Sequence, residues 1–144
     1  MSGAIAAIGT LLKGGNGASP ETFTTVAEVL SVSGPSMTAE TIDVTNHDSA
    51  NATREFLTSF KDGGEVSFSI NYIPSNATHK NATGGLLDAY VNRTLRNWQL
   101  VFPTSPTTTW SFAGLITAFS PTANIDTQLM ADVTIKVSGQ PTLA

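Results

Sequence analysis

Strict alternation of apolar and polar residues in two segments is the feature that most constrains the fold of this chain. In residues 65–73 the apolar parity consists of Val66, Phe68, Ile70 and Tyr72. In residues 129–137 it consists of Leu129, Ala131, Val133, Ile135 and Val137. Because successive side chains of a strand point to opposite faces, both segments are predicted to be strands with one buried face.

Four further strands are predicted from β-branched density, alternation and turn residues, over residues 22–32, 37–44, 98–102 and 110–119. The last of these is mostly apolar, which is typical of a strand packed on both faces. One helix is predicted over residues 80–92, where apolar residues recur at helical spacing. Gly84 and Gly85 weaken its first half.

Strands joined by turns, with a single helix inserted once, indicate a mainly β protein rather than repeated βαβ units. We therefore predict a β-sandwich or barrel of about six or more strands with one flanking α-helix and a long loop. Residues 21–144 are expected to form one domain, and residues 1–20 a flexible N-terminal arm ending in a glycine-rich run. The arm's apolar side chains are expected to become ordered against its own domain or a neighbouring subunit; they are Ile5, Ile8, Leu11 and Leu12.

The long loop is predicted over residues 45–64, a segment with no sustained period that exceeds the usual connection of about 4–6 residues. Long ordered loops are usually functional. Opposite charges stand side by side at Arg54-Glu55 and at Lys61-Asp62. They predict ion pairs, either within the loop or across an interface.

Charge is sparse: 12% of the residues are charged, and seven basic against eleven acidic residues give a net charge of −4. The balance argues against nucleic-acid binding, which needs a basic surface. Low charge favours self-association, because net repulsion keeps monomers apart. We find no run of 18 or more apolar residues, the length that marks a membrane-spanning helix.

No catalytic, cofactor or metal site is predicted. His47, Asp48 and Ser49 are the residue types of a hydrolytic triad, but adjacent side chains diverge and cannot form its hydrogen-bonded chain. A metal site would draw on His47, Asp48 and His79, with Asp43, yet their spacing matches no ligand motif. Trp98 and Trp110 lie in apolar-period strands, which favours core packing over ligand stacking.

Several runs of residues resemble a known family. They are 41–49 (TIDVTNHDS), 54–56 (REF), 61–68 (KDGGEVSF), 98–103, 110–114 (WSFAG) and 133–143. These runs resemble the tail tube proteins of long, non-contractile-tailed bacteriophages, the lambda-like major tail proteins. The resemblance covers nearly the whole folded part of the chain.

The resemblance implies a structural virion protein, made in the bacterial cytoplasm, that assembles into hexameric rings stacked into the tail tube. The implied partners are other copies of the chain, a tape-measure protein in the lumen, and tail tip and terminator proteins, with DNA passing through without specific binding. By the same resemblance, the loop would contact the next ring and the arm would reach a neighbouring subunit. The loop residues concerned are Thr45, Asn46, His47, Asp48, Ser49, Arg54, Glu55, Lys61 and Asp62. The alternative is a monomeric β-sandwich binding or adhesion module, for which exposed aromatic side chains on a strand face would be expected.

Overall fold

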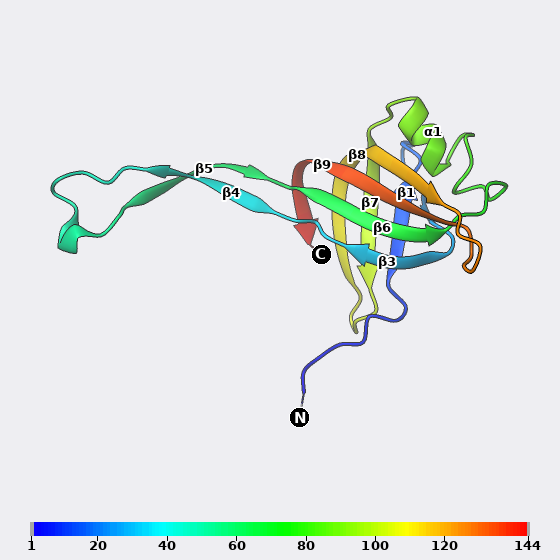
Figure 1. Ribbon diagram of the computed structural model, residues 1–144, viewed down its shortest axis with the longest axis horizontal. Helices are drawn as coiled ribbons and strands as arrows, with labels where there is room; N and C mark the ends of the chain where they lie inside the picture. The colour runs from blue at the N-terminus through cyan, green and yellow to red at the C-terminus, as the bar shows by residue number, and fades with distance from the viewer. Residues whose placement is uncertain (1, 144) are drawn as a thin grey trace.

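The computed structural model describes residues 2–143, and within them it contains nine strands, one short α-helix and one turn of 3-10 helix (Figure 1). The mainly β class with a single helix is therefore confirmed. The elements are β1 (Leu11–Gly15), β2 (Phe23–Thr25), β3 (Val29–Ser33), β4 (Thr38–Asp43), η1 (Ala50–Ala52), β5 (Phe56–Asp62), β6 (Glu65–Asn71), α1 (Leu86–Val91), β7 (Arg96–Phe102), β8 (Thr108–Thr122) and β9 (Met130–Leu143).

Seven strands form one antiparallel sheet in the order β2-β1-β7-β8-β9-β6-β3, and β4 and β5 form a separate pair. Strands β2 and β3 occupy opposite edges of the sheet although only residues 26–28 separate them in the chain. The Val26 N–H donates to the Leu12 carbonyl at 2.8 Å, and the Asn71 N–H donates to the Glu28 carbonyl at 2.9 Å. This short connection closes the sheet on itself around one core (Figure 1).

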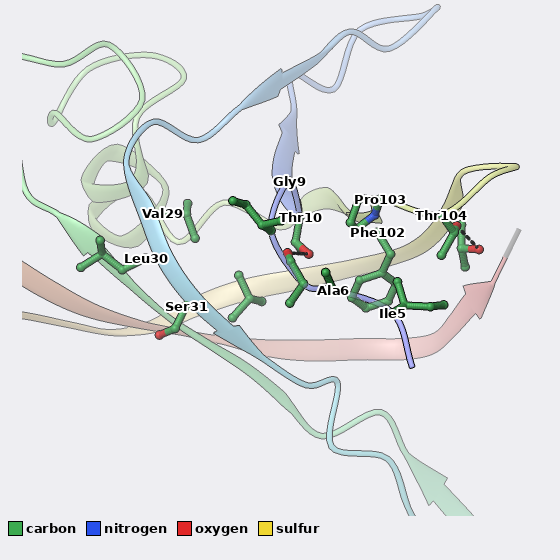
Figure 2. A pocket seen from close by; sticks show the side chains of 14 residues that line it. Ile5, Ala6, Gly9, Thr10, Val29, Leu30, Ser31, Phe102, Pro103 and Thr104 are labelled. Carbon is green, nitrogen blue, oxygen red and sulfur yellow. Dashed lines mark hydrogen bonds between the residues drawn. The ribbon is translucent and has the colours of Figure 1, made fainter. Parts of the chain in front are cut away.

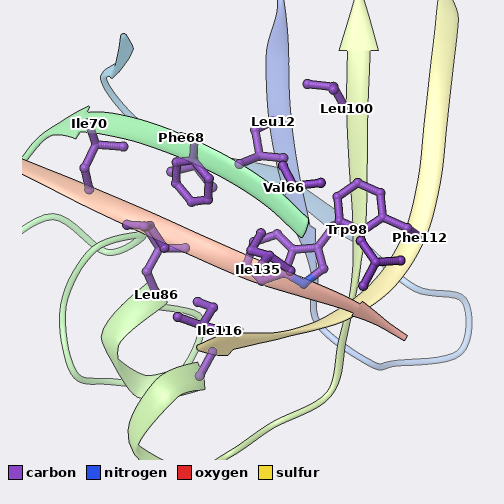
Figure 3. Packing of buried hydrophobic residues seen from close by; sticks show 14 of the residues in the cluster. Leu12, Val66, Phe68, Ile70, Leu86, Trp98, Leu100, Phe112, Ile116 and Ile135 are labelled. Atoms are coloured by element: carbon purple, nitrogen blue, oxygen red, sulfur yellow. The ribbon is translucent and has the colours of Figure 1, made fainter. Parts of the chain in front are cut away.

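The core is built from the apolar parity of the central strands. In the β6–β9 ladder, Val66 lies opposite Ile135 and Phe68 lies opposite Val133. All four of these side chains are buried. Figure 3 shows Val66, Phe68 and Ile135 with Trp98 and other core residues between the two sides of the closed sheet. The alternation thus identified the buried face of β6 and of residues 131–137 in β9, whereas Leu129, just before β9, is exposed and Tyr72, just after β6, is only partly buried.

The expected single strand over residues 22–32 is wrong. The segment forms two short strands, β2 and β3, with a bend at Glu28, whose φ is +57°. A positive φ is uncommon for a residue with a side chain and cannot continue an extended strand. Density of β-branched residues predicted strand on both sides of the bend, but it could not locate the bend.

The helix is shorter than the predicted residues 80–92, because α1 begins at Leu86 and the preceding residues form turns. A Cβ on Gly85, the N-cap, would overlap the backbone oxygen of Lys80, so the turn packs tightly just before the helix begins. Leu86 and Ala89 bury one side of the helix in the core next to β8.

The prediction of a flexible arm over residues 1–20 is wrong for residues 11–15, which form β1. Leu11–Gly15 lies between β2 and β7 in the sheet, and Leu12 is completely buried in the core of its own subunit. Gly14 and Gly15 of the glycine-rich run serve close packing instead, because a Cβ on Gly14 would meet Arg96 and the Trp98 ring and one on Gly15 would meet Glu21. Residues 2–10 remain a segment without strand or helix.

We predict that Phe68→Asp abolishes cooperative folding. Phe68 is buried, and an unpaired carboxylate there costs several kcal/mol, comparable with a whole domain's stability of about 5–15 kcal/mol. Ser67→Asp is the matched control, because Ser67 is the exposed neighbour on the same strand. Thermal unfolding followed by circular dichroism checks both, and a parental transition in Phe68→Asp would contradict the assigned face.

Two truncations distinguish the role of the N-terminal segment before β1 from that of β1 itself. Removing residues 1–9 should leave cooperative unfolding in place, because no strand is lost. Removing residues 1–16 should unfold the domain, because it deletes β1 and with it a buried Leu12 side chain, for which shortening alone costs about 2–5 kcal/mol. Equal melting temperatures for the two truncations would show that β1 is dispensable.

Candidate functional site: a projecting hairpin

The pair β4–β5, with its connecting tip at residues 44–55, projects far from the closed sheet as one long arm (Figure 1). We call residues 38–62 the projecting hairpin. It continues the β3–β6 pair of the body, since β4 follows β3 in the chain and β5 precedes β6. The prediction of an irregular loop over residues 45–64 is therefore wrong for its second half, which forms strand β5. The register shift between Ala39 and Thr41 disrupts the period of two that would have revealed it.

The hairpin exposes large apolar side chains. All of β4 is exposed, and in β5 only Ser59 is partly covered. Ile42 pairs directly with Leu57, and Val44 lies two residues beyond Ile42, so these three side chains share one face. Leu57 is 58% exposed. The opposite face carries the pairs Thr41–Thr58 and Asp43–Phe56. We call Ile42, Val44 and Leu57 the apolar stripe.

The base of the hairpin is fastened to β9. The Lys136 ammonium lies 3.0 Å from an oxygen of Asp62, and the Lys61 ammonium donates to the Gln140 side chain at 3.3 Å. Asp62 also accepts the Gly64 N–H at 2.8 Å. Gly64 has a φ of +73°, and a Cβ there would overlap the Ser36 carbonyl. Only glycine therefore allows these two segments of the backbone to pass this closely.

The tip is ordered by short-range polar contacts. Arg54 forms an ion pair with Asp43 at 2.9 Å across the hairpin, and the Ser49 hydroxyl donates to the Glu55 carboxylate. The Thr45 hydroxyl accepts the Glu55 N–H at 2.8 Å. Hydrogen bonds from Thr45 lower the pKa of Asp43 below its ordinary value, and the hydrogen bond from Arg54 adds to this effect.

The predicted loop residues thus lie in two places. Thr45, Asn46, His47, Asp48, Ser49, Arg54 and Glu55 belong to the tip, whereas Lys61 and Asp62 lie at the base. One ion pair lies within the hairpin, between Arg54 and Asp43, and a second joins the hairpin to β9, between Asp62 and Lys136. The neighbouring charges in the sequence do not pair with each other. Adjacent strand residues face opposite ways, which is why neighbouring charges do not meet. The apolar stripe was missed, although Ile42 and Val44 had the correct parity in the sequence.

The N-terminal segment is a second candidate surface. Residues 5–10 line a groove of about 670 Å³ together with residues of β3 and of the turn after β7. Figure 2 shows Ile5 and Ala6 beside Phe102. Ile8 is 88% exposed, whereas Leu12 is buried inside its own subunit. Of the four predicted arm contacts, Leu12 is therefore excluded as a contact with a neighbour.

His79 has a structural role. Its ring is buried; Nδ1 accepts the Ile73 N–H at 3.1 Å, and Nε2 donates to the Ala27 carbonyl at 2.7 Å. Both ring nitrogens are therefore used within the fold. Over residues 2–143, no group of three side chains is arranged to hold a metal ion. In the same residues, no helix has the length and apolar character needed to span a membrane.

The family model described as "Lambda phage tail tube protein, TTP" matches residues 9–144. The chain belongs to this family. The tail tube protein is thus a structural component of a phage virion, and the family is not one of enzymes. The resemblance seen in the sequence is confirmed, and tube formation replaces the alternative of a monomeric binding or adhesion module. A search of the curated proteins finds no match.

Solved structures share the fold of this tail tube protein at low sequence identity. A chain from the tail of an empty gene transfer agent particle, with C6 symmetry, matches with a TM-score of 0.73 and 17% identity. That match covers 98% of this chain and 99% of the other. The sheath/tube terminator structure of the PVC extracellular contractile injection system gives a TM-score of 0.72 at 11% identity, covering 100% and 99%. A chain from the structure of the anti-feeding prophage cap, its tube terminating cap, gives 0.71 at 12% identity, covering 100% and 93%.

Acid should loosen the base of the hairpin. The Gly64 N–H and then Lys136 lower the pKa of Asp62 below its ordinary value of 3.8. Because the pKa of Asp62 is lower in the folded state, its ionised carboxylate contributes fully to stability above pH 3.8. This contribution is lost as the pH falls through the folded-state pKa. The protection of the Gly64 amide from hydrogen exchange, taken relative to its intrinsic rate at each pH, should therefore fall in the parent as the pH drops through the folded-state pKa of Asp62. In Asp62→Asn this protection should already be lower at neutral pH and should change less with acid, and identical protection profiles in the two proteins would contradict the assignment.

Proposed function

We propose that six copies of the tail tube protein close into a ring, that rings stack into the tube, and that the projecting hairpin bridges each ring to the next. The single observation that carries this proposal is the apolar stripe on a hairpin that projects from the body of the subunit. An isolated two-stranded hairpin is only marginally stable in water, and large exposed apolar surfaces mark interaction sites. A partner surface that covers Ile42, Val44 and Leu57 would supply both the missing stability and the contact.

The ring of six is supported by the C6 symmetry of the gene transfer agent tail, whose chain has the same fold. The dimensions of the subunit also agree with a ring of six. A compact domain of 144 residues has a radius of gyration of about 14–15 Å, and six such bodies around an axis leave a central opening comparable to one subunit. The tape-measure protein would occupy this lumen during assembly, and DNA would pass through it later.

The charge of the subunit suits such a conduit. A net charge of −4 gives each ring a negative balance, so that phosphate groups are not held along the wall. At the two ends of the tube, tail tip and terminator proteins would cover the rings, and synthesis would take place in the bacterial cytoplasm. Chains with this fold are present in structures of the anti-feeding prophage baseplate and of its tube terminating cap, which supports partners at both ends.

The N-terminal segment is proposed as a second contact, made by Ile5, Ile8 and the exposed part of Leu11. Ile5 and Ile8 line the groove between β3 and the turn after β7, and Leu11 is exposed at the start of β1, so a neighbouring subunit would cover all three. This contact would join subunits in addition to the hairpin.

Substitution on the two faces of β5 tests the hairpin. Leu57→Lys places a charge on the apolar stripe, whereas Thr58→Lys places the same charge on the adjacent, opposite face and is the matched control. A penalty of about 1 kcal/mol per subunit sums to about 6 kcal/mol over six subunits, roughly a ten-thousand-fold loss in stacking. We expect Leu57→Lys to remain folded and to form no tubes, while Thr58→Lys forms them.

The measurements are melting temperature and electron microscopy of concentrated protein, with and without tail tip components to nucleate growth. The isolated subunits should melt alike, because both positions are exposed. Normal tubes from Leu57→Lys, or equal loss of tubes in both variants, would show that the apolar stripe is not the ring-to-ring contact.

A further inference from the structure

The turn between β1 and β2 contains the pair Asn16-Gly17, the only Asn-Gly pair in the sequence. The Asn16 side chain is exposed, but its Oδ1 is held by two backbone donors. The Ala18 N–H donates to Oδ1 at 3.0 Å, and the Thr22 N–H donates at 3.1 Å. Two donors on one carbonyl oxygen polarise the carbon to which it is bonded and stabilise negative charge on the oxygen.

A carboxylate accepts a hydrogen bond from the next backbone nitrogen, that of Gly17. One oxygen of Glu21 accepts the Gly17 N–H at 2.9 Å, and the other accepts an N–H of the Asn97 side chain at 2.8 Å. The carboxylate reaches this position across Gly15, where a Cβ would overlap it. It is therefore fixed by the surrounding chain rather than free in solvent.

These groups together meet the requirements of one intramolecular reaction. The Asn16 amide carbon is the electrophile, the Gly17 nitrogen is a nucleophile within the five-membered ring that would form, and Glu21 is a base hydrogen-bonded to that nitrogen. Glycine leaves the nitrogen uncrowded because it has no side chain. Positioned acid–base groups and donors aimed at a developing oxyanion each accelerate such steps.

We propose that Asn16-Gly17 is a self-modification site at which Glu21 and the turn backbone promote deamidation. The Gly17 nitrogen attacks Asn16 Cγ to form a C–N bond, and its proton passes to Glu21. The Cγ–Nδ2 bond then breaks, Glu21 returns the proton, and ammonia leaves from the exposed side chain. Water opens the resulting succinimide at either carbonyl, giving aspartate or isoaspartate, so that the overall reaction exchanges one water for one ammonia.

Two other asparagines in the chain provide internal controls. The Oδ1 atoms of Asn46 and Asn76 also accept the N–H two residues ahead, from Asp48 and Thr78, each at 2.8 Å. Histidine follows Asn46 and alanine follows Asn76, so a side chain crowds the attacking nitrogen. In the described part of the chain, no carboxylate accepts a hydrogen bond from either of those nitrogens.

The reaction would alter an edge of the sheet. It adds one negative charge to a subunit whose net charge is −4 and places that charge beside Glu21. Isoaspartate also lengthens the backbone by one carbon in the turn that leads to β2, one of the two edge strands of the sheet. Each ring built from modified subunits would therefore carry additional negative charge at six equivalent turns.

The test follows deamidation of the purified protein at mildly alkaline pH, folded in buffer and unfolded in urea, by intact mass and peptide mapping. We expect Asn16 in the folded parent to react at least about tenfold faster than in the unfolded chain, since positioned acid–base catalysis contributes about 10²–10⁴-fold. Glu21→Gln keeps a hydrogen-bond acceptor but removes the base. It should therefore lose the acceleration in the folded state and react at the parental rate in urea.

Circular dichroism establishes that the folded samples of both proteins are folded. Equal or slower reaction of Asn16 in the folded parent than in urea would overturn the proposal. So would an undiminished rate in folded Glu21→Gln, or comparable modification of Asn46 and Asn76, because each would remove the need for the carboxylate at Gly17.

Discussion

The connection between β2 and β3 determines the architecture of the subunit. These strands lie at opposite edges of the sheet, yet only residues 26–28 join them, so the sheet must close on itself. The bend is secured from outside: the Ala27 N–H donates to the Thr78 hydroxyl at 3.1 Å, and the Ala27 carbonyl accepts from His79. A buried histidine that has the residue type of a metal ligand therefore serves to hold the corner of a barrel.

Closure of the sheet also accounts for the projecting hairpin. Because β3 pairs with β6, the chain between them must leave the body and return beside itself. Residues 38–62 do this as the β4–β5 pair, and the ion pair between Asp62 and Lys136 fixes its base on β9. The element that lies outside the core is thus a direct extension of two strands inside it.

The sequence predicted the elements whose pattern reflects burial on one face. Alternation located β6 and β9 and identified Phe68 and Val133 as buried, and helical spacing found α1. Prediction from sequence patterns failed where the backbone departs from regular geometry. Glu28 bends the chain within a β-branched run, and the register shift in β4–β5 cancels the period of the hairpin. Leu12 lies near a glycine-rich run that indicates flexibility, although the fold uses Gly14 of that run for close approach to Trp98.

The chemistry of the apolar stripe determines how association through it responds to temperature and salt. Ile42, Val44 and Leu57 carry no charge, and burying such side chains is favoured mainly by the release of ordered water near 25 °C. Contacts of this kind weaken on cooling and are strengthened by salts that are excluded from protein surfaces. Joints between rings made through the stripe would tighten with warming and would be little affected by the ionic screening that dissolves contacts between charged surfaces.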